Sequence, residues 1–393
     1  MTKTFTLEIH GTGTHNRGAE LMAIAIRDRM RKSFPDVRLV VPAGFGGFDE
    51  RAKYGFWTTP EFSGRRRLLP AKTAMRIGGS GARNFLGVVD PKEIDVVLDA
   101  SGFAFSDQWG PAPAKHLFRK MNSRDRASTP LIMLPQAFGA FKNPVVANWT
   151  KMLTGRASLI YARDSQSHDA LYRLGVAKER LRLYPDFTIG ISPGQLPELH
   201  LPGKFVAIVP NFRMMDKGTS PSGYLRFLLN AIKFAQQQEI PPVFILHDAH
   251  EDQKVVAKLK ADGCDIPAIQ HSDPVVLKAV LGQASFVIGS RFHAIVSSFA
   301  QGIPCIGAGW SHKYTELFHD FDCQEFLVDD VRNTALLKTN IAILANQESR
   351  NMYHEKINHA ASRVKQLNDE MWCEVAQVIH NAVCKKKQRV RFN

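Results

Sequence analysis

The sequence lacks the cysteine patterns of disulfide frameworks and of zinc knuckles. It contains five cysteines, an odd number, and none of them stands in a Cys-x-x-Cys pair. This usage argues against a chain held together by disulfides and against a structural zinc site. We therefore expect the cysteines to be plain thiols.

Long apolar runs are missing as well. No stretch reaches roughly eighteen apolar residues, the length that a transmembrane helix needs. Glu8 and His10 interrupt the apolar stretch at the N-terminus, whereas a secretory signal has an unbroken apolar core. We therefore expect a cytoplasmic protein.

Signatures of nucleic-acid readers are absent, although the formal net charge is +14. The sequence has no zinc finger, RNA-recognition signature or basic heptad repeat, so a nucleic-acid reader is disfavoured. Part of the charge gathers in Arg65-Arg66-Arg67 and in residues 385–391 at the C-terminus. Two interpretations stay open for these clusters: peripheral contact with an anionic membrane, or a solvated surface without a specific partner.

What the sequence does contain is an alternation of apolar runs with helical patterns. The chain has 393 residues, 44% of them apolar, which is enough for two or three domains. Continuous runs of Val, Ile and Leu indicate strands that are buried on both faces of a parallel sheet. In the first half we expect strands at residues 5–10, 37–41, 94–100, 130–134 and 159–162, and helices at 18–33, 114–124 and 165–174.

A Pro- and Gly-rich stretch at residues 191–203 interrupts the pattern and predicts an interdomain linker. The alternation then resumes, with strands expected at 205–209, 243–246, 286–289, 305–307 and 325–328. Helices are expected at 222–238, 251–261, 274–281 and 294–301, and a long one from 346 to about 383. We predict an α/β protein of two Rossmann-like domains facing a central cleft, residues 1–195 and residues 203–393, the second with a closing C-terminal helix.

Polar side chains follow the expected strands, and ligands of open parallel sheets bind at those carboxyl ends. In the first half the strand ends carry Asp99, Gln136 and Arg163. In the second half they carry Arg213, the run from Ser290 to His293, and Lys313. The second half therefore predicts an anion-binding site.

The most informative motif is Ser290-Arg291-Phe292-His293, where an expected strand turns into an expected helix. The helix start offers backbone N–H groups, Arg291 a fixed positive charge, and His293 a group that titrates near neutral pH. Ser290 suits the N-cap position. Arg291 and His293 diverge by about 200° on an ideal helix, so only their place in the first turn would let both reach one ligand. A capped helix with a buried histidine is the open alternative.

Three further motifs keep two interpretations each. The Gly11–Gly18 loop follows a strand but meets neither the dinucleotide nor the Walker spacing, so it is a ligand loop or a tight turn. His247-Asp248 begins a polar run that suits either a metal site or the start of a helix. Asp164 or Ser165 suits a helix N-cap, which leaves Arg163 for a ligand or for a structural ion pair.

Taken together, the motifs resemble those of the polysaccharide pyruvyl transferase family over about residues 16–313. The matching stretches are Asn16-Arg17-Gly18-Ala19-Glu20, Pro135-Gln136-Ala137-Phe138-Gly139, Arg163-Asp164, Gly289-Ser290-Arg291-Phe292-His293-Ala294, Gly302-Ile303-Pro304 and Lys313. The chain departs from the family pattern at Ala19, where an acidic residue is usual, and at residues 100–103, where a run of glycines is usual.

The resemblance implies a GT-B-like fold, phosphoenolpyruvate as the donor, and a sugar of a glycan or lipid-linked oligosaccharide as the acceptor. The product would be a pyruvate ketal, with phosphate released and no cofactor or metal required. The second domain would bind the donor and the first the acceptor, in exopolysaccharide or cell-surface glycan biosynthesis.

The chemistry of pyruvyl transfer implies a role for each predicted site residue. Arg213 and Arg291 would bind the carboxylate and phosphate of the donor, because a guanidinium binds such groups bidentately. Lys313 and the helix start at Ser290 would assist, and His293 would protonate the enol carbon. Substrate contacts would also come from the following residues: Asn16, Gly18, Asp99, Gln136 and Arg163.

Two other functions remain open. A nucleotide-sugar glycosyltransferase of the GT-B type would use the same two domains and also needs cations, for a diphosphate. A non-catalytic anion- or glycan-binding homologue is suggested by Ala19 and by the missing glycines near Ser101.

Overall fold

The computed structural model describes residues 5–59, 79–199, 201–218, 220–248, 250–309 and 311–391. The basic cluster at residues 65–67 lies outside the described residues, as do the side chains of residues 385–391, so the predictions made for them stay predictions. Within the described ranges, no helix is both long enough and apolar enough to cross a bilayer.

The chain divides into two compact units, which confirms the prediction of two α/β domains. Unit 1 comprises Met1–His15, Met22–Phe187 and Asp369–Asn393, and unit 2 comprises Asn16–Leu21 and Thr188–Asn368. The predicted bounds are 1–195 and 203–393; in the structure the boundary lies at residues 187/188, residues 16–21 group with unit 2, and the end of the last helix groups with unit 1. Its Trp372 ring packs edge-on against Phe187, with the ring centroids 5.8 Å apart.

Unit 1 is built on a seven-stranded parallel sheet in the order β3-β2-β1-β4-β5-β6-β7. Its strands carry few polar side chains, and β4, β5 and β6 are buried along their whole length. The strands are β1 (Thr6–His10), β2 (Arg38–Pro42), β3 (Trp57–Thr59), β4 (Val96–Asp99), β5 (Leu131–Gln136), β6 (Leu159–Ala162) and β7 (Leu181–Leu183).

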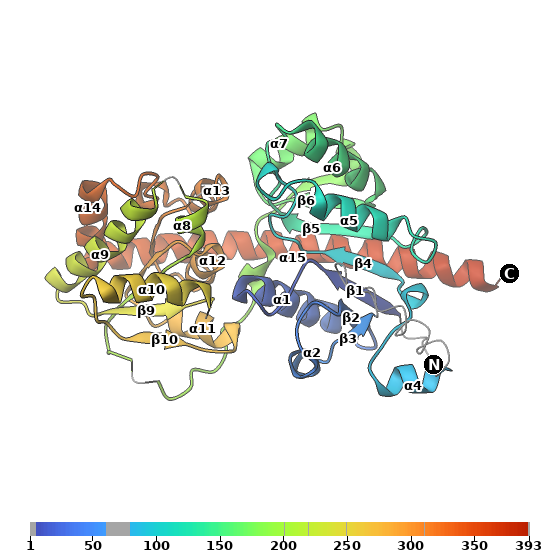
Figure 1. Ribbon diagram of the computed structural model, residues 1–393, viewed down its shortest axis with the longest axis horizontal. Coiled ribbons are helices and arrows are strands. Elements are labelled where there is room, and N and C mark those ends of the chain that lie inside the picture. The colour runs from blue at the N-terminus through green and yellow to red at the C-terminus, as the bar shows by residue number, and fades with distance from the viewer. Residues whose placement is uncertain are drawn as a thin grey trace. The chain divides into compact units, whose positions relative to one another are not determined.

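Helices connect these strands, as parallel neighbours require. Figure 1 shows α5, α6 and α7 in green beside β5 and β6, and α1 and α2 in blue beside β1 and β2. The helices are α1 (Arg17–Ser33), α2 (Phe48–Tyr54), α4 (Gly79–Phe85), α5 (Ala112–Met121), α6 (Pro144–Arg156) and α7 (Ser165–Arg173). Short 3-10 segments are η1 (Pro91–Glu93), η2 (Asp107–Trp109), η3 (Lys178–Arg180) and η4 (Phe187–Gly190).

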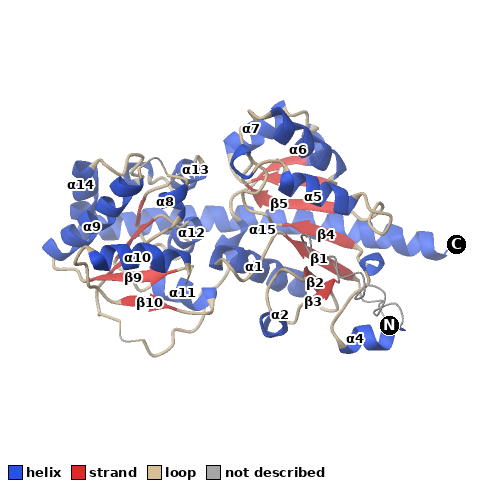
Figure 2. Ribbon diagram, viewed as in Figure 1, coloured by secondary structure: helices blue, strands red, loops and turns tan. Residues whose placement is uncertain are grey.

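Unit 2 has a five-stranded parallel sheet in the order β10-β9-β8-β11-β12, whose strands are drawn in red in Figure 2. The strands are β8 (Val206–Val209), β9 (Pro242–Leu246), β10 (Ala268–Gln270), β11 (Phe286–Gly289) and β12 (Cys305–Gly307). The helices are α8 (Arg213–Asp216), α9 (Pro221–Gln237), α10 (Glu251–Ala261), α11 (Pro274–Leu281), α12 (Phe292–Phe299), α13 (Lys313–Asp320), α14 (Thr334–Ala345) and α15 (Gln347–Arg391), with η5 (Gln324–Phe326) as a 3-10 segment.

One predicted strand is wrong. Residues 325–328 form the end of η5 and a single bridge between Leu327 and Gly307, not a strand. Phe326 is fully buried, so the apolar run has the burial of a strand without its conformation. Short apolar runs do not distinguish these two cases, because periodicity needs more residues to become visible.

A buried charge lies in the middle of unit 1. Glu8 of β1 is completely inaccessible and pairs with Arg126, 2.6 Å away, and with Lys120. Burial alone would raise the pKa of Glu8, but the charges of Lys120 and Arg126 outweigh it and lower the pKa to about 2. The folded state therefore favours the ionised form of Glu8 over its protonated form.

We predict that Glu8 makes the stability of unit 1 sensitive to acid. Its folded pKa lies below the unfolded value, so the stabilisation is present above pH 4.5 and disappears as the pH falls toward 2. A shift of this size corresponds to about 3 kcal/mol. Glu8→Gln should lower the thermal midpoint at pH 7 and flatten its dependence on pH between 5 and 2, as followed by circular dichroism.

The matched control is Glu179→Gln, which alters an exposed carboxylate of the same unit. It should leave both the midpoint and its pH dependence close to those of the wild type. An acid transition of Glu8→Gln that coincides with the wild-type transition would contradict the role of this ion pair.

Candidate functional site

Each sheet has one place where the strand order reverses, and ligands of such sheets bind there. In unit 2 this place lies between β8 and β11, because the chain continues from β8 to β9 on one side and from β11 to β12 on the other. Asn211 and Arg213 follow β8, and the run from Ser290 to His293 follows β11. The motif that the sequence singled out therefore lies at the expected binding position of its sheet.

Hydrogen bonds to one backbone carbonyl fix the turn after β11. The carbonyl oxygen of Ser290 accepts from Asn211 Nδ2 at 2.6 Å and from the hydroxyl of Tyr314 at 2.8 Å. Both donors are buried. The ends of β8 and β11 and the start of α13 are thereby held together around this carbonyl.

Ser290 is not the N-cap of the following helix, contrary to the sequence prediction. Arg291 takes that position with an extended backbone and no side-chain cap bond, and α12 begins at Phe292. Because Arg291 lies before the helix, the divergence of about 200° expected for Arg291 and His293 on one helix does not apply. A role for Ser290 toward substrate stays a prediction.

Arg291 forms the dominant ion pair of this site. Its Nε donates to Asp252 Oδ2 at 3.0 Å and its Nη2 to Asp252 Oδ1, while Asp248 Oδ2 lies 3.6 Å from Nη2. Burial would lower the pKa of Arg291, but Asp252 and Asp248 outweigh it and raise that pKa. No described residue forms a hydrogen bond with Nη1, so this nitrogen is the part of the guanidinium that a ligand can use.

His293 packs against the first turn of α1. A Cβ atom placed on Gly18 would lie 2.2 Å from His293 Nδ1, far inside van der Waals contact. The turn itself is set by Asn16, whose Oδ1 accepts from the Gly18 N–H at 2.8 Å. Two motifs that stand 275 residues apart in the numbering, Gly18 and His293, thus meet within unit 2.

His247, at the end of β9, is not among the site residues that the sequence predicts. It is 4% exposed, and its Nε2 has no hydrogen-bond partner among the described residues. Burial lowers its pKa to about 3, with further lowering by the charges of Arg291, His293 and Arg17. In the sequence, the only signal for His247 is its position at a strand end.

The metal interpretation of the His247-Asp248 run receives no support from its hydrogen bonds. Asp248 Oδ1 accepts from the backbone N–H of Glu251 at 2.9 Å and of His250 at 3.2 Å, as a residue before a helix does. Across the part of the chain that the structure describes, no group of three or more His, Cys, Asp and Glu residues is placed to hold a metal ion.

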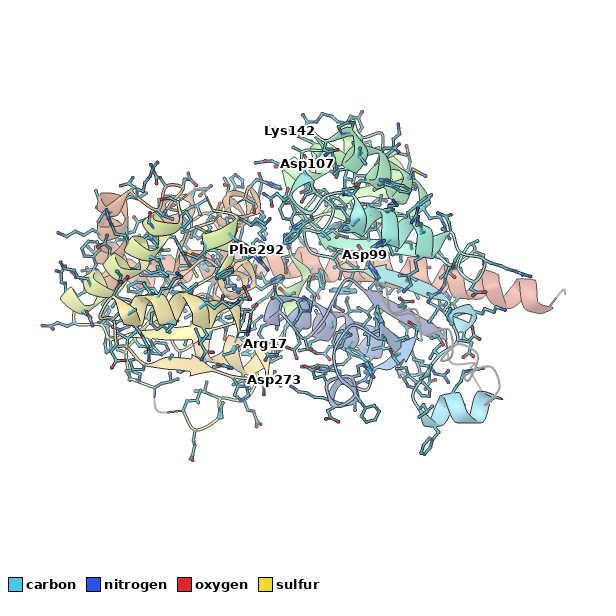
Figure 3. The ribbon with its side chains drawn as sticks, viewed as in Figure 1. Arg17, Asp99, Asp107, Lys142, Asp273 and Phe292 are labelled. Atoms are coloured by element: carbon cyan, nitrogen blue, oxygen red, sulfur yellow. The ribbon has the colours of Figure 1, made fainter. Side chains whose placement is uncertain are left out.

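Arg213 and Lys313 lie in the first turns of α8 and α13. Arg213 pairs with Asp216 on the same helix and its side chain is 39% exposed. The Lys313 ammonium lies 5.3 Å from the Phe292 ring centroid, and Figure 3 labels Phe292 and Arg17 in this unit. Their predicted roles as donor-binding residues stay predictions.

In unit 1, Asp99 is the centre of a second polar cluster. It is fully buried and accepts from Gln136 Nε2 at 2.8 Å, from Ser101 Oγ at 2.6 Å and from His10 Nδ1 at 2.7 Å. Figure 3 labels Asp99 at this position. The structure thus brings two predicted residues, Asp99 and Gln136, together with His10, which the sequence analysis did not propose for the site.

Arg163 forms an ion pair inside unit 1. Its Nη1 lies 2.9 Å from Asp186 Oδ2, and both side chains are 4% exposed. The next residue, Asp164, accepts from the Ser167 N–H at 2.7 Å and caps α7, which confirms the N-cap prediction. Of the two interpretations left open for Arg163, the structure contains the ion pair, and a contact with substrate stays a prediction.

We predict that Gly18→Ala destabilises unit 2 only while His293 is present. Overpacking of this kind costs about 1–3 kcal/mol, whereas the same change in an unhindered helix position gains about 0.5–1 kcal/mol. Gly18→Ala should lower the thermal midpoint of the wild type, and the same change in a His293→Ala background should leave it equal or higher. Equal losses in both backgrounds, measured by differential scanning fluorimetry, would contradict the contact.

Solved structures share the fold of this chain at low sequence identity. The Anabaena protein Alr3699/HepE in complex with UDP and glucose aligns with a TM-score of 0.58 and 13% identity, over 95% of this chain and 99% of that one. The UDP-GlcNAc 2-epimerase of Neisseria meningitidis bound to UDP-GlcNAc aligns with a TM-score of 0.59 and 12% identity, over 95% and 100%. A glycosyltransferase from Rickettsia africae ESF-5 aligns with a TM-score of 0.58 and 11% identity, over 96% and 99%. These likenesses establish the GT-B-like fold.

Sequence comparison is more specific about the family. No curated protein gives a significant match to the chain. The family model described as polysaccharide pyruvyl transferase matches residues 16–312, a span that includes both the Asn16-Arg17-Gly18 turn and the Ser290–His293 motif. The chain therefore belongs to the polysaccharide pyruvyl transferase family.

Proposed function

We propose that this protein transfers the pyruvyl group of phosphoenolpyruvate to a sugar, forming a pyruvate ketal and releasing phosphate. The acceptor is a sugar of a glycan or of a lipid-linked oligosaccharide, made for an exopolysaccharide or a cell surface. The observation that carries the proposal is the buried Arg291 guanidinium at the strand-order reversal of unit 2, with His293, packed against Gly18, two residues further on. A donor that carries a carboxylate and a phosphate needs a guanidinium of this kind, because it binds either group through charge-assisted hydrogen bonds.

Three basic residues at the strand ends of unit 2 would bind the two anionic groups of the donor. Arg291 keeps its charge through Asp252 and Asp248 and still offers Nη1 to a carboxylate or phosphate oxygen. Arg213 is half-exposed on the neighbouring strand end and can leave Asp216 for the second anionic group, because an exposed ion pair is worth little. Lys313 adds a third cation for the phosphate.

His293 serves as the proton donor in this scheme. It protonates the methylene carbon of phosphoenolpyruvate, and C2 becomes the electrophile. A sugar hydroxyl oxygen then bonds to C2 and loses its proton. When a second hydroxyl bonds to C2, the C2–O bond to phosphate breaks, and the phosphate leaves with the electron pair. Two hydroxyl protons are released, of which one replaces the proton of His293 and the other passes to phosphate or solvent.

We expect His293→Gln to lower phosphate release from phosphoenolpyruvate in the presence of acceptor by about 10²–10⁴-fold, the usual contribution of a positioned acid. Arg213→Ala should instead weaken donor binding about tenfold to hundredfold, the value of a charge-assisted hydrogen bond. A coupled phosphate assay gives both values, with circular dichroism as the check on folding.

The matched controls replace exposed residues of the same types in the same unit. His319→Gln and Arg226→Ala should keep wild-type rates and donor affinity. Undiminished phosphate release by His293→Gln would remove His293 from the chemistry.

The competing function is transfer of a sugar from a nucleotide, and the fold neighbours favour it, since their structures contain UDP or UDP-GlcNAc. Ligand-induced stabilisation separates the two. At 100 times the dissociation constant a ligand stabilises a protein by about 2.7 kcal/mol, which shifts the thermal midpoint measurably. We expect a shift with phosphoenolpyruvate and none with UDP-GlcNAc or GDP-mannose at equal concentration.

The opposite pattern would favour the nucleotide-sugar enzyme. Stabilisation by phosphoenolpyruvate without phosphate release in any assay would favour the third candidate, a binding protein without turnover.

A further inference from the structure

Unit 1 has its own strand-order reversal, between β1 and β4. The chain continues from β1 to β2 and β3 on one side, and from β4 to β5, β6 and β7 on the other. His10 is the last residue of β1 and Asp99 the last of β4, and the two are paired in register across the sheet. The position at which a parallel sheet binds ligands is thus occupied by a histidine next to a carboxylate.

The geometry orients the histidine. Asp99 is fully buried, and its Oδ1 lies 2.7 Å from His10 Nδ1. Gln136 and Ser101 donate to the same carboxylate, so it cannot rotate away without losing two other hydrogen bonds. A carboxylate acceptor fixes the proton on Nδ1 and leaves the lone pair of a neutral imidazole on Nε2.

The free edge of His10 can be reached. Its side chain is 25% exposed, while that of Asp99 is completely covered. No described residue forms a hydrogen bond with His10 Nε2. A buried carboxylate behind an accessible imidazole is the arrangement in which a histidine accepts a proton from a bound hydroxyl, with the carboxylate stabilising the imidazolium that forms.

The loop that follows β1 is shaped to preserve this arrangement. Gly11 has a φ of +79°, and a Cβ on it would lie 2.3 Å from Ser101 Oγ. A side chain at position 11 would therefore push on the hydroxyl that donates to Asp99. This contact accounts for the first glycine of the Gly11–Gly18 loop by close approach.

We propose that His10, positioned by Asp99, binds the attacking hydroxyl of the acceptor sugar and takes its proton. The inference rests on the proposed pyruvyl transfer and names the residue of unit 1 that would activate the acceptor. The O–H bond of the sugar breaks, the proton passes to Nε2, and the electron pair stays on the sugar oxygen, which is the nucleophile of the proposed transfer. Solvent then takes the proton from His10, so that one turnover leaves the imidazole neutral.

The test compares wild type, His10→Gln, His10→Ala and Asp99→Asn in two assays. The first is the thermal shift produced by phosphoenolpyruvate. The second is phosphate release with methyl β-D-galactopyranoside or methyl β-D-glucopyranoside as acceptor, or with water where neither reacts. We expect donor-induced shifts within about twofold of wild type, and phosphate release reduced by about 10²–10⁴-fold in the His10 variants. Phosphate release by Asp99→Asn should also fall, because an amide no longer fixes the tautomer of His10.

Two further measurements separate proton transfer from a structural role. Added imidazole should restore part of the phosphate release of His10→Ala, and should not restore that of Asp99→Asn. His116→Gln, an exposed histidine on α5 of the same unit, should retain the wild-type rate. No rescue, together with an unchanged thermal midpoint, would overturn the proton-transfer role.

The outcomes distinguish this inference from the function on which it rests. A donor-induced shift in wild type with undiminished phosphate release by His10→Gln overturns the role of His10 and leaves pyruvyl transfer standing. If phosphoenolpyruvate neither stabilises the wild type nor releases phosphate in any arm, pyruvyl transfer fails, and the role of His10 fails with it.

Discussion

The candidate site of unit 2 depends on the buried carboxylate of Asp252. It pairs with Arg291 after β11, and it accepts backbone N–H bonds from Phe212 after β8, at 3.2 Å, and from Asp248 after β9, at 2.9 Å. One side chain therefore ties together the loops that follow three neighbouring strands. Losing it would leave the Arg291 guanidinium buried without its counter-charge, which is far more costly than losing an exposed ion pair.

Unit 1 is organised in the same way, with a different partner. Asp99 accepts from His10 at the end of β1, from Ser101 beyond β4 and from Gln136 at the end of β5. Asp252 holds a guanidinium, which is a fixed cation, whereas Asp99 holds the partly exposed imidazole of His10. In the proposed reaction, the guanidinium would serve the anionic donor and the imidazole a hydroxyl of the acceptor, because these ligands require a positive charge and a proton acceptor respectively.

Patterns of continuous apolar residues predicted the framework well. The strands at 159–162, 286–289 and 305–307, and the helices at 251–261 and 274–281, have the bounds that the sequence indicated. The short outer strands β3, β7 and β10 are not predicted because, unlike the equally short but fully buried β12, they contain polar and partly exposed residues and form no continuous apolar run. The family was also predictable, because its motifs occur in order along the chain and the family comparison confirms them.

The sequence by itself determined the two α/β units, the family and the strand-end position of each polar motif, because burial of parallel strands imposes a pattern that local residues reveal. It did not determine the partners. That Arg291 pairs with Asp252, that His293 rests on Gly18, and that His10 shares Asp99 with Gln136 depends on residues far apart in the chain. Only the tertiary structure decided these, since strand order, rather than sequence order, sets which carboxyl ends are neighbours.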